Sequence, residues 1–298
     1  MSCQTWIRKH TAPLTGKTVA ISGSTGGLGQ ALCRRLAGLG ADLVLLDRNK
    51  ERAAALQDEL RQKFAVRVEY IPLDLENMGA VLAAADRLAD KPPHVLILNA
   101  GAYAIPRHLC DTGYDNVFQI NYLAPYVLTR RLLPALNQNG GHVVAVGSIA
   151  HTYSKTDPAD IDFRTRRQAS LAYGHAKRRL TFSLYDLFRG QTATLAVTHP
   201  GIAFTNITNH YPKVIFALIK HPMKVLFMKP KKACLSILRG VFDPCGEREW
   251  IGPWLFHVWG LPKKTALATV SREEQAAIAA DADRLYAEIT EKYAVKKE

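Results

Sequence analysis

One segment near the N-terminus, Ser22-Gly23-Ser24-Thr25-Gly26-Gly27-Leu28-Gly29, is the most informative of the chain. It directly follows a short apolar run, Thr18–Ser22, and it opens a stretch with helical spacing, Gly27–Leu39. Glycines at such a junction let the chain turn tightly and let its backbone approach a pyrophosphate bound by the N–H groups of the helix N-terminus. A glycine-rich turn alone is weak evidence, so its interpretation depends on the rest of the chain.

Further short apolar runs alternate with longer amphipathic stretches such as Glu51–Lys63. The runs are Leu43–Asp47, Val66–Ile71, Val95–Asn99, His142–Gly147 and Thr194–Thr198. Near-continuous apolar character over so few residues is typical of strands that are covered on both faces, as in parallel sheets. The alternation therefore predicts an α/β fold, with one doubly wound parallel sheet and helices on both faces.

The chain is predicted to hold a single domain, residues 15–298, after an N-terminal extension, residues 1–14, for which we predict no element. Within the domain, residues 203–245 are expected to form a substrate lid. Residues 271–292 are expected to form a C-terminal helix, because Ser271 and Glu274 have the spacing of a capping box.

Composition limits the class of protein. Five scattered cysteines include no C-x-x-C pair, which argues against a disulfide framework or a zinc ribbon and favours a reducing, cytoplasmic compartment. Met1–Thr15 lacks the apolar run of a secretory signal, and the apolar run Val214–Ile219 is far shorter than the roughly 20 residues of a membrane span. We therefore expect a soluble protein.

The end of the second strand bears on the cofactor. A carboxylate at Asp47 can accept hydrogen bonds from an adenosine ribose and would repel a 2′-phosphate. Ser24, Thr25 and Gly26 offer no basic side chain for that phosphate, whereas Arg48 could stack on adenine or pair with it. NAD(H) is favoured, and NADP(H) remains the alternative.

Three polar residues have the spacing of an acid–base site. Tyr173 and Lys177 are four residues apart and share one face of a predicted helix. A neighbouring ammonium favours a phenolate, so Lys177 is expected to bring the pKa of Tyr173 from its usual value of about 10 toward neutrality. Ser148, at the end of the fifth strand, can hold a substrate oxygen on which charge develops.

Taken together, these motifs resemble the short-chain dehydrogenases/reductases over Gly16 to about Gly252. The landmarks of that family occur in order: the glycine segment with Ser22 in place of the family's threonine, Asp74-Leu75, Asn99-Ala100-Gly101, Asn121, Ser148, Tyr173, Lys177, Pro200-Gly201 and Thr205. The resemblance implies a Rossmann fold and a hydride transfer between a nicotinamide and an alcohol or carbonyl carbon, with Tyr173 moving the proton.

The resemblance also assigns roles to individual residues. Asn121, Ser148, Tyr173 and Lys177 would be catalytic, and Asn121 would fix a water that links Lys177 to solvent. The cofactor would contact Gly23, Ser24, Thr25, Gly27, Leu28, Gly29, Asp47, Arg48, Asp74, Leu75, Asn99, Ala100, Gly101, Tyr173, Lys177, Pro200, Gly201 and Thr205. No metal is expected, because His142, His151, His175 and His199 show no ligand spacing.

The insert from His151 to Ser170 makes the interval between Ser148 and Tyr173 longer than in many family members. It is similar to the branch of the retinol dehydrogenases and the WW-domain oxidoreductase, which implies a small alcohol or carbonyl substrate of apolar character. The alternative is a regulatory or membrane-surface protein that binds the cofactor with little or no turnover.

The net charge of +13 is concentrated, since Leu187–Phe242 contains no acidic residue. The basic, apolar segment 213–232 could be a lid packed on the core, a hydrophobic lid over the substrate, or a surface that contacts an anionic membrane peripherally. Trp250, Trp254, Phe256 and Trp259 could line the same pocket or fill the core.

No nucleic-acid module is present, so nucleic acid is not expected as a partner. Relatives commonly pair through the helices of Asn121 and Tyr173, so a homo-oligomer is an open expectation, although the C-terminal segment could obstruct it.

Overall fold

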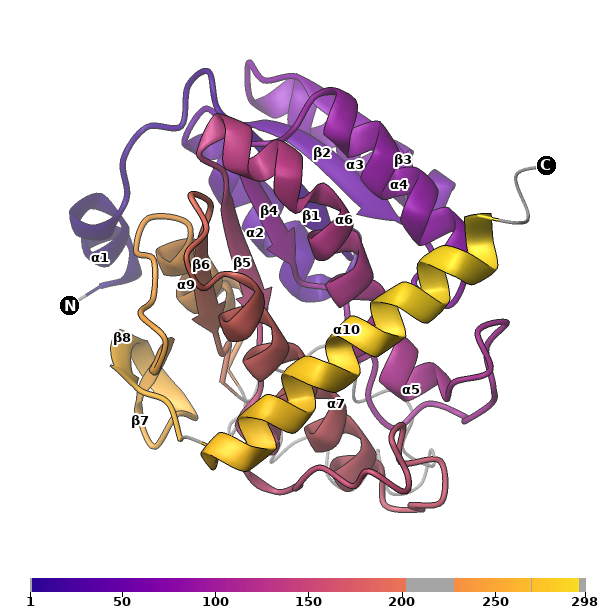
Figure 1. Cartoon of the computed structure of the whole chain (residues 1–298). Coiled ribbons are helices and arrows are strands. Elements are labelled where there is room, and N and C mark those ends of the chain that lie inside the picture. The colour runs from indigo at the N-terminus through magenta and orange to yellow at the C-terminus, as the bar shows by residue number, and fades with distance from the viewer. Residues whose placement is uncertain (1, 202–227, 269, 295–298) are drawn as a thin grey trace, which may run out of the picture.

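The computed structural model describes residues 2–201, 228–268 and 270–294. One eight-stranded sheet runs through it in the order β3-β2-β1-β4-β5-β6-β7-β8 (Figure 1). All neighbouring strands are parallel except β7 and β8. The predicted doubly wound α/β sheet is thus confirmed.

Six strands lie where the apolar runs predicted them. They are β1 (Thr18–Ser22), β2 (Asp42–Asp47), β3 (Val68–Pro72), β4 (Val95–Leu98), β5 (His142–Val146) and β6 (Thr194–Thr198). The antiparallel pair β7 (Glu249–Leu255) and β8 (Trp259–Ala266) was not predicted as strands. Pro253 and Pro262 face each other in this pair, and prolines argue against a strand when only the sequence is considered.

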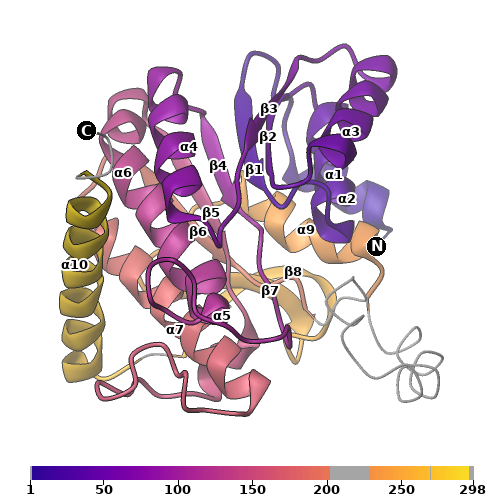
Figure 2. The same ribbon diagram turned by 90° about the vertical axis from the view of Figure 1, so that its right-hand side faces the viewer.

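Two helical layers cover the sheet, as Figure 2 shows from the side. One layer contains α1 (Cys3–His10), α2 (Gly27–Gly38), α3 (Lys50–Lys63) and α9 (Pro230–Gly240), and its side chains form one core cluster. The other contains α4 (Met78–Asp90), α6 (Ala124–Asn139), α7 (Ala169–Leu187) and α10 (Arg272–Ala294), around a second cluster. Two short turns flank the site: α5 (Asn116–Phe118), continued by the π-helical turn η1 (Gln119–Leu123), and the 3₁₀ turn η2 (Ile149–Thr152).

The N-terminal extension contributes to the core. Ser2 caps α1, and Trp6 of this helix is only 2% exposed within the cluster that also contains residues of α2 and α9. No element was predicted there because an eight-residue helix with one buried face gives little periodicity. The first core layer therefore includes residues 3–10.

The segment predicted as a lid, residues 203–245, divides into two parts. Residues 203–227 lie outside the described residues, as does Thr205. Residues 230–240 form α9, which buries Cys234, Leu235, Ile237 and Leu238 and packs against α2. This part is a core helix rather than a cover for a substrate.

The C-terminal helix α10 begins one residue later than predicted and crosses the outer face of the second layer (Figure 1). The backbone N–H of Glu274 donates to the Ser271 hydroxyl at 3.1 Å, as in a capping box. The Glu274 carboxylate, however, bonds Arg178 and Thr156 instead of returning to Ser271. The predicted motif is therefore only half realised, because a buried arginine provides a stronger partner.

Candidate active site

The candidate residues gather at the carboxyl ends of the parallel strands. Gly23, Asp47, Asn99 and Ser148 follow or end β1, β2, β4 and β5. Strand β1 lies between β2 and β4, so the chain order reverses at this point of the sheet. Open α/β sheets bind ligands at such a switch point, which is where the glycine segment lies.

Two glycines of this segment cannot be replaced without moving backbone. Gly23 has a φ of +65°, and a Cβ placed on it would lie 2.9 Å from the Cα of Ala100. A Cβ on Gly29 would lie 2.1 Å from the carbonyl oxygen of Gly23. The loop and the first turn of α2 therefore form a close-packed backbone cradle of the kind that binds a pyrophosphate.

Ser22, which stands where the family has threonine, ties this cradle to the loop after β4. Its hydroxyl oxygen accepts hydrogen bonds from the backbone N–H groups of Asn99 and Ala100, both at 3.0 Å. The side-chain amide of Asn99 donates to the carbonyl oxygens of Ser22 and Gly23. Its Oδ1 is buried without a partner, which leaves one acceptor for a ligand next to the cradle.

Asp47 is buried and bonded to the glycine loop. Its Oδ2 accepts from the N–H of Thr25 at 2.9 Å and from the Ser24 hydroxyl at 3.3 Å, and its Oδ1 accepts from the N–H of Asn49 at 3.3 Å. Arg48 is exposed. The carboxylate thus shapes the loop, in addition to placing a negative charge where a ribose is expected.

Asp74 and Leu75 follow β3 on the same side of the sheet. Asp74 accepts from the N–H of Glu76 at 3.0 Å, and the carbonyl of buried Leu75 accepts from Gln119.

Pro200 and Gly201 follow β6, and Gly201 has a φ of +78°. A Cβ there would lie 2.6 Å from the carbonyl oxygen of Val258, so the chain passes close to the β7–β8 connection.

Asn121 and Lys177 converge on Gly101. A Cβ on Gly101 would lie 2.9 Å from Oδ1 of Asn121 and 3.6 Å from Nζ of Lys177. Asn121 lies in the π-helical turn η1, and such turns are frequent at functional sites. Its amide donates to the carbonyls of Ala102 and Val117 and accepts from the N–H of Ala102, so it holds the loop after Gly101 in place.

Tyr173 and Lys177 lie on α7 and face the end of β5. Nζ of Lys177 donates to the carbonyl of Val146 at 2.9 Å and lies 5.8 Å from the centre of the Tyr173 ring. Burial lowers the pKa of Lys177 to about 8. The Ser148 hydroxyl is a hydrogen-bond partner of Tyr173, and its own oxygen accepts from the N–H of Ala150 at 3.2 Å.

The phenol of Tyr173 differs from the expectation. Burial raises its pKa to about 12, the hydrogen bond from Ser148 lowers it, and Lys177 is not among the groups that act on it. The prediction that Lys177 brings this pKa toward neutrality is therefore not met in this structure. The physical reason is that Lys177 is itself buried, which weakens its ammonium form, and that its Nζ is engaged by Val146.

Two aromatic neighbours of the site were missed from the sequence. Tyr103 packs edge-on against Tyr173, with ring centres 5.3 Å apart. Phe163, from the insert after Ser148, stacks on His175 at 3.7 Å between ring centres. Only the nearness of Tyr103 to Asn99-Ala100-Gly101 could have pointed to the first; nothing local in the sequence points to the second.

The histidines take structural positions. His142 bonds Thr194 and the carbonyl of Gly240, and burial lowers the pKa of His175 to about 4 and that of His199 to about 3. Among the residues that the structure describes, no group of histidine, cysteine and acidic side chains could hold a metal ion. Within the same residues, no helix is long and apolar enough to cross a membrane.

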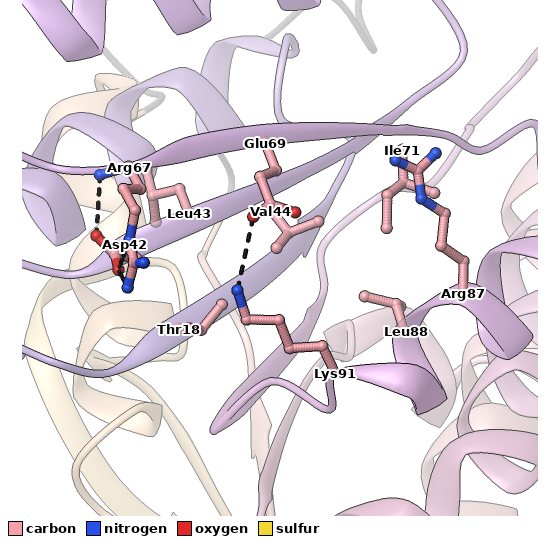
Figure 3. A pocket seen from close by; sticks show the side chains of 10 residues that line it. All are labelled: Thr18, Asp42, Leu43, Val44, Arg67, Glu69, Ile71, Arg87, Leu88 and Lys91. Atoms are coloured by element: carbon pink, nitrogen blue, oxygen red, sulfur yellow. Dashed lines mark hydrogen bonds and ion pairs between the residues drawn. The ribbon is translucent and has the colours of Figure 1, made fainter.

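A hollow at the opposite, amino-terminal end of the strands is a different feature (Figure 3). It has a volume of about 50 Å³ and is crossed by the ion pairs of Arg67 with Asp42 and Lys91 with Glu69. That volume holds one or two waters and no substrate. A wider groove of about 480 Å³ runs beside the glycine loop, lined by Thr25 of that loop and by residues of α2 and α3, including Gln30 and Arg52.

Known proteins share this sequence and architecture. Residues 17–157 match the family model described as short chain dehydrogenase. The putative daunorubicin C-13 ketoreductase DnrU of Streptomyces sp. (strain C5) is 31% identical over 67% of this chain and 71% of its own length. Mouse polyprenol dehydrogenase is 27% identical over 80% of this chain and 75% of its own length, and mouse retinol dehydrogenase 14 is 29% identical over 78% and 79%.

Solved structures agree. A putative uncharacterized protein from Mycobacterium paratuberculosis superposes with a TM-score of 0.71 at 26% identity, covering 94% of this chain and 95% of that one. A short-chain dehydrogenase from Sphingobium yanoikuyae in complex with NADPH has a TM-score of 0.58 at 24% identity, covering 75% and 84%. One from Burkholderia phymatum in complex with NAD has a TM-score of 0.59 at 20% identity, covering 78% and 87%. The chain belongs to the short-chain dehydrogenases/reductases, in their retinol dehydrogenase-like branch, and is an NAD(P)-dependent enzyme of that family.

Proposed function

We propose that this enzyme interconverts an apolar secondary alcohol or aldehyde with its oxidised or reduced partner, with Tyr173 as the acid–base group. The observation that carries the proposal is the meeting of Ser148, Tyr173 and Lys177 at the end of β5, beside the glycine cradle. A nicotinamide bound there would supply or accept the hydride. The remaining chemistry belongs to the residues of this chain.

Tyr173 donates or accepts the proton at the substrate oxygen, through its phenolic oxygen. Ser148 holds that oxygen with its hydroxyl, whose position is set by the N–H of Ala150. Burial lowers the pKa of Lys177 to about 8, so its ammonium can return the proton more readily than an exposed lysine, and Asn121 beside it would hold the connecting water. Side chains of this chain are therefore sufficient to carry the proton between the substrate and Tyr173.

The residues fit a dinucleotide. At Gly23 and Gly29 the cradle has no room for a side chain, so it is built from backbone atoms alone. The buried Oδ1 of Asn99, which has no hydrogen-bond partner, lies beside it. Asp47 supports NAD(H) as the preferred form, because its charge opposes a 2′-phosphate. The features that favour NADP(H) are the exposed Arg48 after β2 and the exposed Arg52 in the adjoining groove.

An apolar substrate is supported by the surroundings of Tyr173. Ile105, Phe163 and Val117 form a small apolar cluster against its ring, and Tyr103 packs on its edge. Relatives carry the names polyprenol dehydrogenase and retinol dehydrogenase, whose substrates are apolar alcohols. Alcohols and carbonyls of increasing chain length should therefore be turned over with increasing kcat/KM.

The test is a panel of such alcohols and carbonyls, followed by the absorbance of the reduced nicotinamide with NAD(H) and NADP(H). Tyr173→Phe should bind cofactor as the wild type does and lose turnover by about two to four orders of magnitude. Tyr103→Phe, a matched change on the neighbouring ring, should keep most of it. Full activity in Tyr173→Phe would refute the acid–base role. A wild type that binds cofactor but converts no substrate would favour a regulatory protein.

A second candidate is peripheral contact with an anionic membrane surface. Trp254 and Phe256, at the β7–β8 connection, are 61% and 78% exposed, and Lys231, Lys232 and Lys263 are exposed as well. Exposed aromatic and basic side chains together favour an interfacial position. Sedimentation with phosphatidylserine vesicles tests it: Trp254→Ser with Phe256→Ser should abolish binding, and wild-type protein that stays in solution at low salt would exclude the contact.

The oligomeric state stays a prediction. Helix α10 packs on α7, and its Asp283 and Tyr286 contact Arg130 of α6. These are the helices through which relatives were expected to pair. We therefore propose a monomer, which light scattering can test.

A further inference from the structure

The C-terminal helix reaches the catalytic helix through one buried arginine. Arg178 directly follows Lys177 on α7, and its side chain is 10% exposed. Its Nε and Nη2 donate to the two oxygens of Glu274, in the first turn of α10, both at 2.7 Å. Such a two-point pair fixes the plane of the guanidinium as well as its position.

The remaining nitrogen of the same guanidinium, Nη1, binds η2, the turn after Ser148. Nη1 of Arg178 donates to the carbonyl of His151 at 3.0 Å. The imidazole of His151 in turn bonds the carbonyl of Ser148 through Nδ1 at 2.7 Å. Because a carbonyl oxygen only accepts, Nδ1 carries a proton, and burial, which lowers the pKa of the ring, disfavours a second proton on the buried Nε2.

These bonds form one path from α10 to Ser148. The path acts on the reacting group because Ser148 caps η2: the N–H of Ala150 binds its hydroxyl oxygen at 3.2 Å. A shift of η2 therefore turns the hydroxyl of Ser148 relative to Tyr173. Glu274 also accepts from the N–H and hydroxyl of Thr156, so the start of the insert is held by the same carboxylate.

We propose that Glu274 and Arg178 are positioning residues, which set the Ser148 hydroxyl toward Tyr173 through His151 and η2. The proposal rests on the proposed function for its catalytic consequence, but the geometry it describes can be measured without turnover. A neighbouring pair provides the matched control. Arg179 donates to Asp281 at 2.9 Å between the same two helices, and its side chain, 1% exposed, is more deeply buried than that of Arg178, yet it makes no bond to η2.

Glu274→Gln and Asp281→Asn each remove one charge from the α7–α10 interface. We expect both to lower the melting temperature. Only Glu274→Gln should reduce kcat, by about ten- to a hundredfold, with the KM for cofactor unchanged. It should also move the basic limb of the pH–rate profile upward, because Tyr173 loses the hydrogen bond that lowers its pKa. Equal kcat and pH profiles in the two variants would overturn the proposal.

His151 offers a rescue experiment. His151→Asn keeps an N–H close to the position of Nδ1 and should retain more of the rate than His151→Leu, which has no donor. If the two variants lose the same fraction of kcat, the bond from His151 to Ser148 has no positioning role.

A readout without turnover separates this proposal from the proposed function. With ¹³Cζ-labelled tyrosine, the resonance of Tyr173 is assigned by its loss in Tyr173→Phe. It should move in Glu274→Gln and stay in place in Asp281→Asn, even if no substrate is converted. If the wild type converts no substrate but the Tyr173 resonance still moves in Glu274→Gln, the proposed function is refuted and the positioning is supported. If the resonance does not move in Glu274→Gln, the positioning is refuted.

Discussion

A Cβ atom on Gly174 would lie 2.3 Å from the carbonyl oxygen of Ala150. Gly174 directly follows Tyr173 on α7, and Ala150 lies in η2, two residues after Ser148. The backbone of the catalytic helix and the turn that carries the serine are therefore in direct contact. This contact fixes how near the two catalytic hydroxyls can come.

Gly174→Ala should push η2 away from α7. We expect a loss of about 1–3 kcal/mol in the free energy of unfolding, typical of overpacking, and a clear fall in kcat. Urea unfolding and steady-state kinetics measure the two effects. Gly38→Ala is the control: the new Cβ would meet Phe64 at an ordinary 3.5 Å, so this variant should gain up to about 1 kcal/mol from helix propensity. A Gly174→Ala protein as stable and active as the wild type would contradict the contact.

Asp47 can be tested by separating its charge from its hydrogen bonds. Asp47→Asn keeps an acceptor for the N–H of Thr25 and removes the charge. The ratio of kcat/KM with NADP(H) to kcat/KM with NAD(H) should therefore rise by about tenfold, because a loss of ~1.4 kcal/mol of repulsion between the carboxylate and the 2′-phosphate corresponds to that factor. Asp47→Ala also releases the glycine loop and should raise KM for both cofactors. A wild type that already prefers NADP(H) strongly would show that Asp47 does not select the cofactor.

Buried histidines predict a loss of stability in mild acid. Burial lowers the pKa of His175 to about 4 and that of His199 to about 3, from 6.5. Between these values the unfolded chain binds more protons than the folded one, so stability is fully present above pH 6.5 and falls as the pH drops toward 4. Each group contributes up to about 1.4 kcal/mol per pH unit.

Melting temperatures at several pH values between 7.5 and 5 measure this loss. His175→Gln should flatten the dependence, because it removes one of the buried groups that must take up a proton on unfolding. A melting temperature that is constant over the range would contradict the assignment of neutral, buried imidazoles.

Trp6 predicts that α1, residues 3–10, is part of the folded unit. Its ring is buried beside α2 and α9 and stacks on His10 at 4.7 Å. Trp6→Ala should cost about 3–5 kcal/mol in the free energy of unfolding and leave KM for cofactor unchanged, because α1 lies away from the strand ends. Ile7→Ala, at a partly buried neighbour, should cost clearly less. An unchanged urea midpoint in Trp6→Ala would mean that α1 is not docked in solution.

The sheet could be predicted because a parallel strand is marked in its own few residues. Each run such as Leu43–Asp47 or Thr194–Thr198 is apolar for most of its length, and the observed boundaries differ by two residues at most. The pair β7–β8 lacks that mark, since its prolines and tryptophans fit strands only once a neighbour is in place. Helix α1 is recognisable only from the core that receives Trp6.

Within the site, the sequence indicated which residues gather but not their electrostatics. The spacing of Tyr173 and Lys177 predicts a shared helix face, which the structure has. It does not reveal that Lys177 is buried and Tyr173 half-buried, or that the loss of water around each group moves its pKa in the direction that opposes its charge. The contacts that Tyr103 and Glu274 make with α7 could not be predicted either, because they join segments far apart in the chain.

The bond between α7 and α10 has a consequence for protein engineering. A chimaera that takes its central segment from one relative and its last helix from another inherits the two ends of a single ion pair from different parents. Arg178 without Glu274 would be a stranded cation under the catalytic turn, and Glu274 without Arg178 a stranded anion. The two residues should be exchanged as a unit, although nearly a third of the chain separates them.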